Sequence, residues 1–314
     1  MTNKSLVLSH GDLDGCVGGI VCQKHIKIVE GDDHEVIVIP CSYENINDHT
    51  AEAFAHASEY KHILVVDICF NADLHKVMPD NCRVYDHHDT SKFILDTKNC
   101  FWEHKYCGAV VAWRHLFTGE KMTKPFNRLM GYANEYDMWI GEKGPRKICH
   151  DLNVIFRYYR YKDFFDRYYD GFECFTKEET DYLDSYWNKQ QEILDDTYKV
   201  AYGSDVILFL VSDDRLDANY WCNHFLHEEG FNVIILTWPH KNRISVRSSS
   251  RVEWFHSGYW LRDNIVNANG SKGGHAKAAG CSTEGMSEDD ILNIGVKIQT
   301  LIDEKKEEVS HESK

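Results

Sequence analysis

Short apolar runs alternate with stretches of helical periodicity along the first part of the chain. The runs predict four strands, at residues 6–9, 35–40, 62–67 and 82–86. Helical stretches separate the first three of them, at residues 17–27 and 48–59. Continuous apolar strands separated by helices are typical of a parallel sheet that helices cover on both faces. The pattern therefore predicts an α/β fold that begins with a parallel-sheet domain.

The pattern changes in the second half of the chain. Residues 108–196 are mostly helical in pattern, and a new α/β pattern starts at residue 205. This second pattern predicts strands and a last helix, at residues 206–211, 232–236, 243–247 and 288–303.

The length of the chain is consistent with these two patterns. Domains of roughly 150 residues are common, so 314 residues suggest two of them. We expect a first domain at residues 1–190, a helical linker at 191–204, and a smaller α/β domain at 205–314.

Composition excludes several classes of protein. The chain has 35 Lys and Arg residues against 50 Asp and Glu residues, a formal charge of −15, which argues against binding to duplex DNA or to an anionic membrane. Its 11 cysteines are scattered without a Cys-x-x-Cys pair, which argues against a zinc ribbon or a disulfide framework. No apolar run approaches the roughly 18 residues of a membrane span, and the first residues lack the apolar region of a signal peptide. We therefore expect a cytoplasmic protein with reduced thiols.

Acidic and histidine side chains gather where the predicted strands end. If the backbone stays extended after the first strand, the alternating residues His10, Asp12 and Asp14 point in one direction. Asp67 ends the third strand, and the fourth runs into Asp86-His87-His88. The carboxyl ends of parallel strands share one edge of the sheet, so these groups are expected to converge. Each residue alone also fits a helix cap or a turn.

These side chains, with Asp137 from the helical segment, form a set of metal-ligand type. The set is larger than one divalent ion usually takes from a protein, and it suits two ions that share a bridging carboxylate. Such a pair activates a bridging water and holds a phosphate for attack. Asp and His ligation without thiolate favours Mn²⁺ over Mg²⁺ or structural zinc, with Mg²⁺ and Co²⁺ as alternatives.

The same residues carry a resemblance to a known family. The segments around Asp12, Asp67, His87 and Asp137 resemble, in order, the four motifs of the DHH phosphoesterases. Residues 272–280, which contain Gly-Gly-His, resemble the signature of the associated DHHA1 domain. The resemblance spans nearly the whole chain. It is strongest to the nano-RNase, or oligoribonuclease, branch, whose members are similar to RecJ exonucleases in chemistry but degrade very short RNAs.

The resemblance implies a role for each motif residue. His10 and Asp12 would bind the first ion, while Asp14, His87 and Asp137 would bind the second. Asp67 would bridge the two ions. His88 would act on the phosphate, and Asp86 would orient His87 through a hydrogen bond. His10 precedes Asp12 by two residues, whereas many relatives that cleave the products of cyclic dinucleotides have a spacing of four. Direct ligation by His10 is therefore left open.

The resemblance also implies that the second domain holds the substrate. Arg247 and Ser248 lie on a strand that would bind a phosphate, since the guanidinium group suits bidentate phosphate contact. The backbone of Gly273 and Gly274 would approach an anion closely, and His275 would add a hydrogen bond. A surface ion pair at Arg247 and a plain turn at the glycines are the alternatives.

The functional expectation is a Mn²⁺-dependent phosphodiesterase that hydrolyses short oligoribonucleotides to nucleoside monophosphates. Its partner would be a short single-stranded RNA or a dinucleotide, with no duplex DNA and no membrane, and a homodimer is left open. One alternative is a phosphatase or phosphodiesterase acting on 3′-phosphoadenosine 5′-phosphate or on linear dinucleotides such as pApA. A second alternative is a non-catalytic sensor that binds nucleotides.

Overall fold

The computed structural model of the protein divides into two units, Met1–Leu183 and Asp184–Lys314. It describes residues 3–95, 97–117, 122–140, 144–211, 213, 215–265, 273–274 and 277–312. The division falls within a single helix, α7 (Lys177–Asp195). Each unit is built on its own β-sheet.

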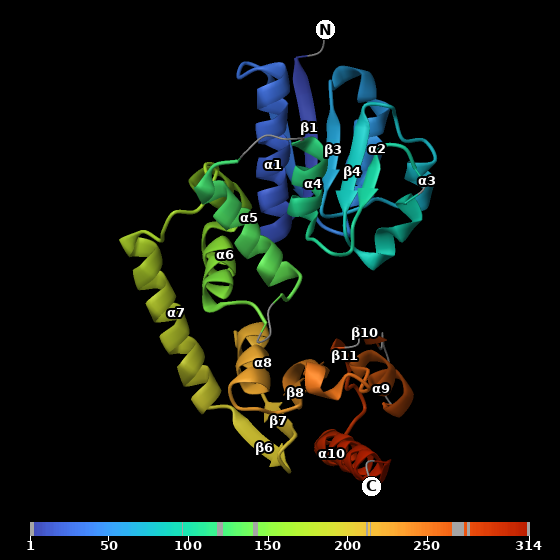
Figure 1. The fold of residues 1–314 in the computed structure, drawn as a ribbon, viewed down its shortest axis with the longest axis vertical. Helices are drawn as coiled ribbons and strands as arrows, with labels where there is room; N and C mark the ends of the chain where they lie inside the picture. The colour runs from blue at the N-terminus through green and yellow to red at the C-terminus, as the bar shows by residue number, and fades with distance from the viewer. Residues whose placement is uncertain are drawn as a thin grey trace. The chain divides into compact units, whose positions relative to one another are not determined.

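The first unit is built on a five-stranded parallel sheet in the order β2-β1-β3-β4-β5. Its strands are β1 (Lys4–His10), β2 (Glu35–Cys41), β3 (Ile63–Val66), β4 (Cys82–Asp86) and β5 (Cys100–Trp102). Helices α1 (Leu13–Glu30) and α4 (Gly108–Leu116) cover one face, while α2 (Ile46–Ala55) and the short α3 (Ala72–His75) lie on the other (Figure 1).

Successive side chains of a strand point to opposite faces of the sheet, and because helices cover both faces, the strands are apolar on both. Leu6 and Leu8 of β1 pack in a cluster with Ile46 and Ala53 of α2. Val7, between them, points to the opposite face and is fully buried. A half-exposed sheet would place a polar residue at that position.

The remaining helices of this unit pack outside α1. They are α5 (Lys124–Asp137) and α6 (Lys147–Arg167). Helix α6 is kinked at Arg160, whose φ of 63° is non-helical. Beyond the kink the hydroxyl of Tyr161 meets the hydroxyl of Ser9. The kink therefore brings a partly buried hydrogen bond to Ser9, the residue that precedes His10.

Helix α7 begins with a reciprocal cap that we expect to be important for stability. The Thr176 backbone N–H donates to Glu179 at 2.6 Å, and the Glu179 N–H donates to the Thr176 hydroxyl at 3.2 Å. The buried Glu179 carboxylate also accepts from the Tyr168 hydroxyl at 2.8 Å and from Arg167 Nε at 3.1 Å. Burial would raise the pKa of Glu179, but these hydrogen bonds outweigh it and hold the pKa below its usual value.

Replacing Glu179 by glutamine should destabilise the protein by about 2 kcal/mol at neutral pH, because a charged acceptor of several hydrogen bonds is lost. Since the pKa is lowered by folding, the wild-type advantage exists above the unfolded value of 4.5 and disappears as the pH falls through the folded value. Urea unfolding of both proteins from neutral to acidic pH measures this. The exposed i,i+4 pair of Asp181 with Lys177 supplies the control: Asp181→Asn should cost only tenths of a kcal/mol. An equal loss in both variants would contradict the assignment.

The second unit is built on a six-stranded mixed sheet in the order β10-β11-β9-β8-β7-β6. Strands β7 and β8 pair in parallel, while β6 with β7, β8 with β9, β9 with β11 and β10 with β11 pair antiparallel. Its strands are β6 (Tyr198–Tyr202), β7 (Val206–Leu210), β8 (Val233–Trp238), β9 (Arg243–Ser248), β10 (Gly273–Gly274) and β11 (Ala278–Ser282). Its helices after α7 are α8 (Ala218–His227), α9 (Ser257–Asn264) and α10 (Glu288–Glu312).

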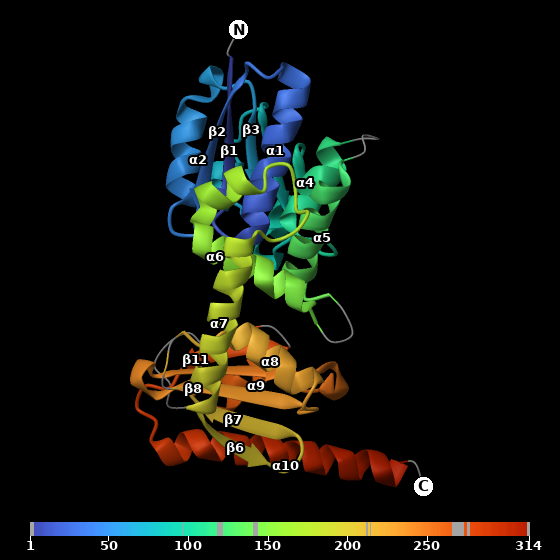
Figure 2. The same cartoon turned by 90° about the vertical axis from the view of Figure 1, so that its left-hand side faces the viewer.

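Helices cover both faces of this second sheet. Ile207 and Phe209 of β7 pack in a cluster with Trp221 of α8. Val206 and Leu208 of the same strand face the cluster that contains α9 and α10. Figure 2 shows α10 running along one side of the strands. The strand is therefore apolar throughout for the same reason as β1.

The predicted fold class is confirmed: the protein is α/β, with a parallel N-terminal sheet and a second sheet. One segment differs from its prediction. The expected linker at 191–204 contains the end of α7 and strand β6, which pairs with β7. The sequence pattern failed there because β6 lies at the edge of the sheet and exposes Tyr198 and Lys199. Strands β5, β10 and β11 were also not predicted.

The cysteines are thiols that form no disulfide. Nine of the 11 are buried, Cys69 is partly exposed and Cys174 is exposed. Over the part of the chain that the structure describes, no helix combines the length and apolar character needed to cross a membrane.

Candidate metal centre

The motif residues of the first unit meet at the carboxyl edge of its parallel sheet. His10 and Asp86 are the last residues of β1 and β4, and Asp67 follows β3 directly. Asp12 caps α1 and Asp14 lies in its first turn. Asp137 is the last residue of α5. The convergence that the parallel sheet predicts therefore occurs within a single unit.

Two groups of possible ligand atoms share Asp67. In one group, His10 Nδ1 lies 3.0 Å from Asp12 Oδ2 and 3.5 Å from Asp67 Oδ2. In the other, His87 Nε2 lies 3.2 Å from Asp67 Oδ1 and 3.3 Å from Asp137 Oδ2. Asp14 Oδ2 lies 4.0 Å from the same His87 nitrogen. One oxygen of Asp67 thus faces each group, which is the arrangement of a bridging carboxylate.

The hydrogen-bonding state of these atoms supports a metal centre. Several of them are buried and have no hydrogen-bond partner: His10 Nδ1, both carboxylate oxygens of Asp67, His87 Nε2 and Asp137 Oδ2. Buried polar atoms are almost always hydrogen-bonded, so convergent exceptions need an explanation. Divalent cations would supply the missing partner for each of these lone pairs. The residues present therefore fit two such ions.

The electrostatics lead to the same conclusion. Burial, followed by neighbouring carboxylates, raises the pKa of Asp67 and Asp14 well above the usual aspartate value. Burial and Asp14 raise the pKa of Asp137 to about 7. Three aspartates that repel one another in a buried site are unfavourable without cations. Divalent cations reverse the sign of the local field and favour the ionised carboxylates.

Close backbone approaches hold the ligands in place. Asp14 is nearly fully buried, and it accepts hydrogen bonds from the backbone N–H groups of Gly108 at 2.6 Å and Ala109 at 3.0 Å, at the start of α4. A Cβ on Gly108 would lie 2.5 Å from the Cβ of Asp67, so only glycine fits there. Asp67 itself has a left-handed φ of 62°. Strained, over-packed backbone of this kind is typical of functional sites.

The expectation of an extended backbone from His10 to Asp14 is only partly correct. Asp12 is extended, with φ of −108° and ψ of −170°, but Asp14 already lies in α1. The helix begins early because the Asp12 side chain accepts a hydrogen bond from the Gly15 N–H at 2.9 Å. Asp12 therefore serves as a helix cap and also as a member of a ligand group.

The expected partner of Asp86 is corrected by the structure. Its Oδ1 lies 2.8 Å from Nδ1 of His88 and accepts the backbone N–H of His87 at 2.8 Å. The ring of His87 instead contacts Asp67 and Asp137. Asp86 therefore orients the ring of His88, because β4 ends at Asp86 and the chain turns back over its carboxylate.

Hydrogen bonding between Asp86 and His88 also sets their charge. Burial would lower the pKa of His88, but the bond to Asp86 outweighs it and the pKa is raised. Burial would raise the pKa of Asp86, but the bonds from His88 and its neighbours hold it below its usual value. The Asp86 carboxylate is thus charged and favours protonation of His88.

The sequence reasoning missed Tyr43. It lies just after β2, with its ring centre 5.2 Å from that of His10 and 6.1 Å from that of His88. The side chain is 55% exposed. No motif contains it, but the rule that found the ligands would also have found it, since it follows a strand end at the same edge of the sheet.

The residues predicted to bind phosphate lie in the second unit. Arg247 Nη1 donates to the Ser245 hydroxyl at 2.6 Å, and over the described residues the guanidinium pairs with no carboxylate. Ser248 is buried, and its hydroxyl lies 3.2 Å from that of Ser257. Gly273 and Gly274 form β10. His275 lies outside the described residues.

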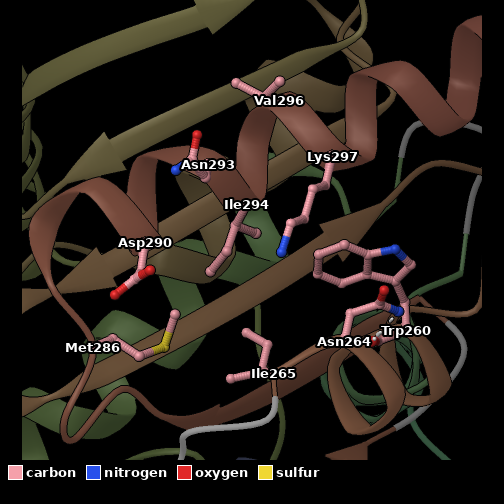
Figure 3. A pocket seen from close by; sticks show the side chains of 9 residues that line it. All are labelled: Trp260, Asn264, Ile265, Met286, Asp290, Asn293, Ile294, Val296 and Lys297. Atoms are coloured by element: carbon pink, nitrogen blue, oxygen red, sulfur yellow. Dashed lines mark hydrogen bonds between the residues drawn. The ribbon is translucent and has the colours of Figure 1, made fainter.

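A pocket of about 260 Å³ lies elsewhere in the second unit, between α9 and α10 (Figure 3). The indole of Trp260 and the ammonium of Lys297 line it together with apolar side chains such as Ile294. Arg247 and the β10 glycines do not line this pocket. It is therefore separate from the predicted phosphate contacts.

Comparison with known proteins places the fold. No family model and no curated protein matches the chain. Among solved structures, a pGpG-specific phosphodiesterase, PggH from Vibrio cholerae, matches with a TM-score of 0.62 and 13% identity, over 95% of this chain and 99% of that one.

Two further structures agree. A DHH domain from a protein described as a member of a family of ribosomal proteins matches with a TM-score of 0.61 and 13% identity, over 94% of this chain and 86% of that one. RecJ from Thermus thermophilus, solved with Mn²⁺, matches with a TM-score of 0.55 and 14% identity, over 95% of this chain and 52% of that one. The chain therefore has the fold of the DHH-domain phosphoesterases, as the resemblance predicted.

Proposed function

We propose that the protein is a metal-dependent phosphodiesterase of the DHH/DHHA1 family that hydrolyses short oligoribonucleotides to nucleoside monophosphates. One observation carries the proposal: the two buried oxygens of Asp67 have no hydrogen-bond partner, and one faces His10 while the other faces His87. Two divalent cations held there, Mn²⁺ by preference, would supply a nucleophilic water at neutral pH and stabilise charge on the phosphate.

The protein's own residues would then position the substrate and donate a proton to it. Because Nδ1 of His88 is bonded to Asp86, Nε2 is the ring atom left to meet the substrate. A protonated Nε2 would donate to a phosphate oxygen or to the leaving oxygen. In the second unit Arg247, with no carboxylate partner over the described residues, would contact a phosphate of a nucleotide.

A short substrate follows from charge. At −15 the chain repels long polyanions, while cations at the metal centre would attract a short one locally. Linear dinucleotides are the second candidate, since the structural neighbour PggH is described as pGpG-specific. A non-catalytic sensor is disfavoured because His10, Asp12, Asp14, Asp67, His87 and Asp137 are all present and converge.

A panel of substrates tests the proposal. Initial rates with Mn²⁺ are compared for RNAs from dinucleotides to long oligomers, cyclic and linear dinucleotides, and 3′-phosphoadenosine 5′-phosphate. We expect nucleoside monophosphates as products, with rates that fall as the RNA lengthens. No hydrolysis of any phosphodiester with Mn²⁺, Mg²⁺ or Co²⁺ would contradict the proposal. Bound Mn²⁺ without turnover would indicate the sensor instead.

A further inference from the structure

Trp139 ends helix α5 in a conformation that tryptophan rarely adopts. Its φ is 51°, in the left-handed region. The Ile140 N–H donates to the Glu135 carbonyl at 3.1 Å, and the Met138 N–H donates to that of Asn134 at 3.0 Å. The first of these bonds marks a Schellman-type helix end, in which Trp139 holds the position that glycine usually fills. A bulky residue there is strained.

The packing of Trp139 leaves part of its ring uncovered. The side chain is 39% exposed, and the next residue, Ile140, is 44% exposed. The indole contacts His150 at 5.8 Å and Tyr136 at 6.3 Å between ring centres, with planes inclined by 88° and 58°. Neither neighbour stacks parallel on it. Glycine would end the helix without strain, so the partly exposed tryptophan at this position calls for a reason.

The position of Trp139 suggests that reason. Asp137, whose Oδ2 lies 3.3 Å from His87 Nε2, precedes it by two residues. Two residues of chain span at most about 7 Å, so the backbone of Trp139 lies at the rim of the metal centre. In a nucleotide the base is one ribose away from the phosphate. An aromatic face at this rim is therefore within reach of the base of a nucleotide whose phosphate lies at the metal centre.

We propose that Trp139 stacks on a nucleobase of the substrate, so that the enzyme selects nucleotides over phosphodiesters that carry no base. The proposal rests on the proposed function and deepens it. Stacking would be tolerant of base identity, because every base offers an aromatic face. The strained backbone is then explained by binding, because a tryptophan at this position offers a base an aromatic face that glycine lacks.

The test compares ligands that differ only in the base. Calorimetric titration in the presence of Mn²⁺ measures binding of adenosine 5′-monophosphate and of ribose 5-phosphate to the wild type, Trp139→Gly and Trp139→Phe. Glycine suits the backbone at this position, so Trp139→Gly is expected to fold. In Trp139→Gly we expect the affinity for adenosine 5′-monophosphate to fall by about 5- to 150-fold, while the affinity for ribose 5-phosphate stays the same. Trp139→Phe should keep most of the preference.

Tyr198→Ala, which removes a 64% exposed ring from the second unit, is the matched control and should behave as the wild type. An equal loss of affinity for both ligands in Trp139→Gly, or an undiminished preference for the base, would overturn the proposal. Hydrolysis of a dinucleotide is measured in parallel. If the wild type shows Trp139-dependent base preference but no hydrolysis, the proposed function fails and the stacking role stands.

Discussion

Replacing Asp67 by asparagine should abolish hydrolysis and yet stabilise the metal-free protein. Asp67 has one oxygen directed at each ligand group, so its loss affects both ions. Residues that only support a metal ligand already cost 10–100-fold when removed, so we expect a loss of more than about 100-fold here. Asparagine tolerates the left-handed φ of 62°, so the backbone is retained.

The stabilising effect follows from the buried charge. Without cations, burial and Asp12 raise the pKa of Asp67, which means that its carboxylate is unfavourable in the folded state. Asparagine removes that cost, by roughly 1–3 kcal/mol. We expect Asp67→Asn to unfold at a higher urea concentration than the wild type in chelator, and to lose the increase in Tm that Mn²⁺ gives the wild type.

Asp73→Asn, which removes an exposed carboxylate paired with Lys76, is the control and should change neither property. Near-normal turnover in Asp67→Asn would disprove the two-metal assignment. A wild type whose Tm does not respond to Mn²⁺ would disprove metal binding at this site.

Replacing Gly108 by alanine should damage fold and activity together. The added Cβ would lie 2.5 Å from the Cβ and 2.6 Å from the Cα of Asp67. Overpacking of this kind costs typically about 1–3 kcal/mol. Helix α4 can relieve it only by moving, which would break the hydrogen bonds of Gly108 and Ala109 to Asp14. Urea unfolding and the initial rate with Mn²⁺ measure the two effects, and we expect more than tenfold loss of rate.

Gly131 provides the matched control for this substitution. It lies within α5, and an added Cβ would meet nothing within 4 Å. Gly131→Ala should therefore stabilise the protein by up to about 1 kcal/mol, because alanine is the better helix former, and leave the rate unchanged. If Gly108→Ala behaves like Gly131→Ala, then α4 is not tightly packed against the metal centre.

The candidate ligands could be found from the sequence because one rule of parallel-sheet topology places them together. His10, Asp67 and His87 are far apart along the chain, but strand ends of a parallel sheet share an edge, so the pattern alone brings them together. Details that depend on local hydrogen bonding could not be found. The bond of Asp86 to His88, and the early start of α1 at Leu13, arise from turns whose geometry leaves no periodicity in the sequence.

Features with a weak pattern were missed for a different reason. Strand β6 is an edge strand with exposed side chains, so its hydrophobic pattern is diluted. Tyr43 was missed because it belongs to no motif, although the strand-end rule that found the ligands also points to it. The left-handed conformation of Trp139 could not be predicted either, because the residue type argues against it.

Because most of the thiols are buried, their reactivity would report the unfolding of the unit that contains them. Cys174 is exposed and Cys69 is partly exposed, whereas Cys222 and Cys281 are buried in the second unit and seven other thiols are buried in the first unit. A thiol reagent would therefore label Cys174 at once, and the buried thiols only when the unit that contains each one opens. Because both units hold buried thiols, the sites that react first would show which unit unfolds more readily, without any mutation being introduced.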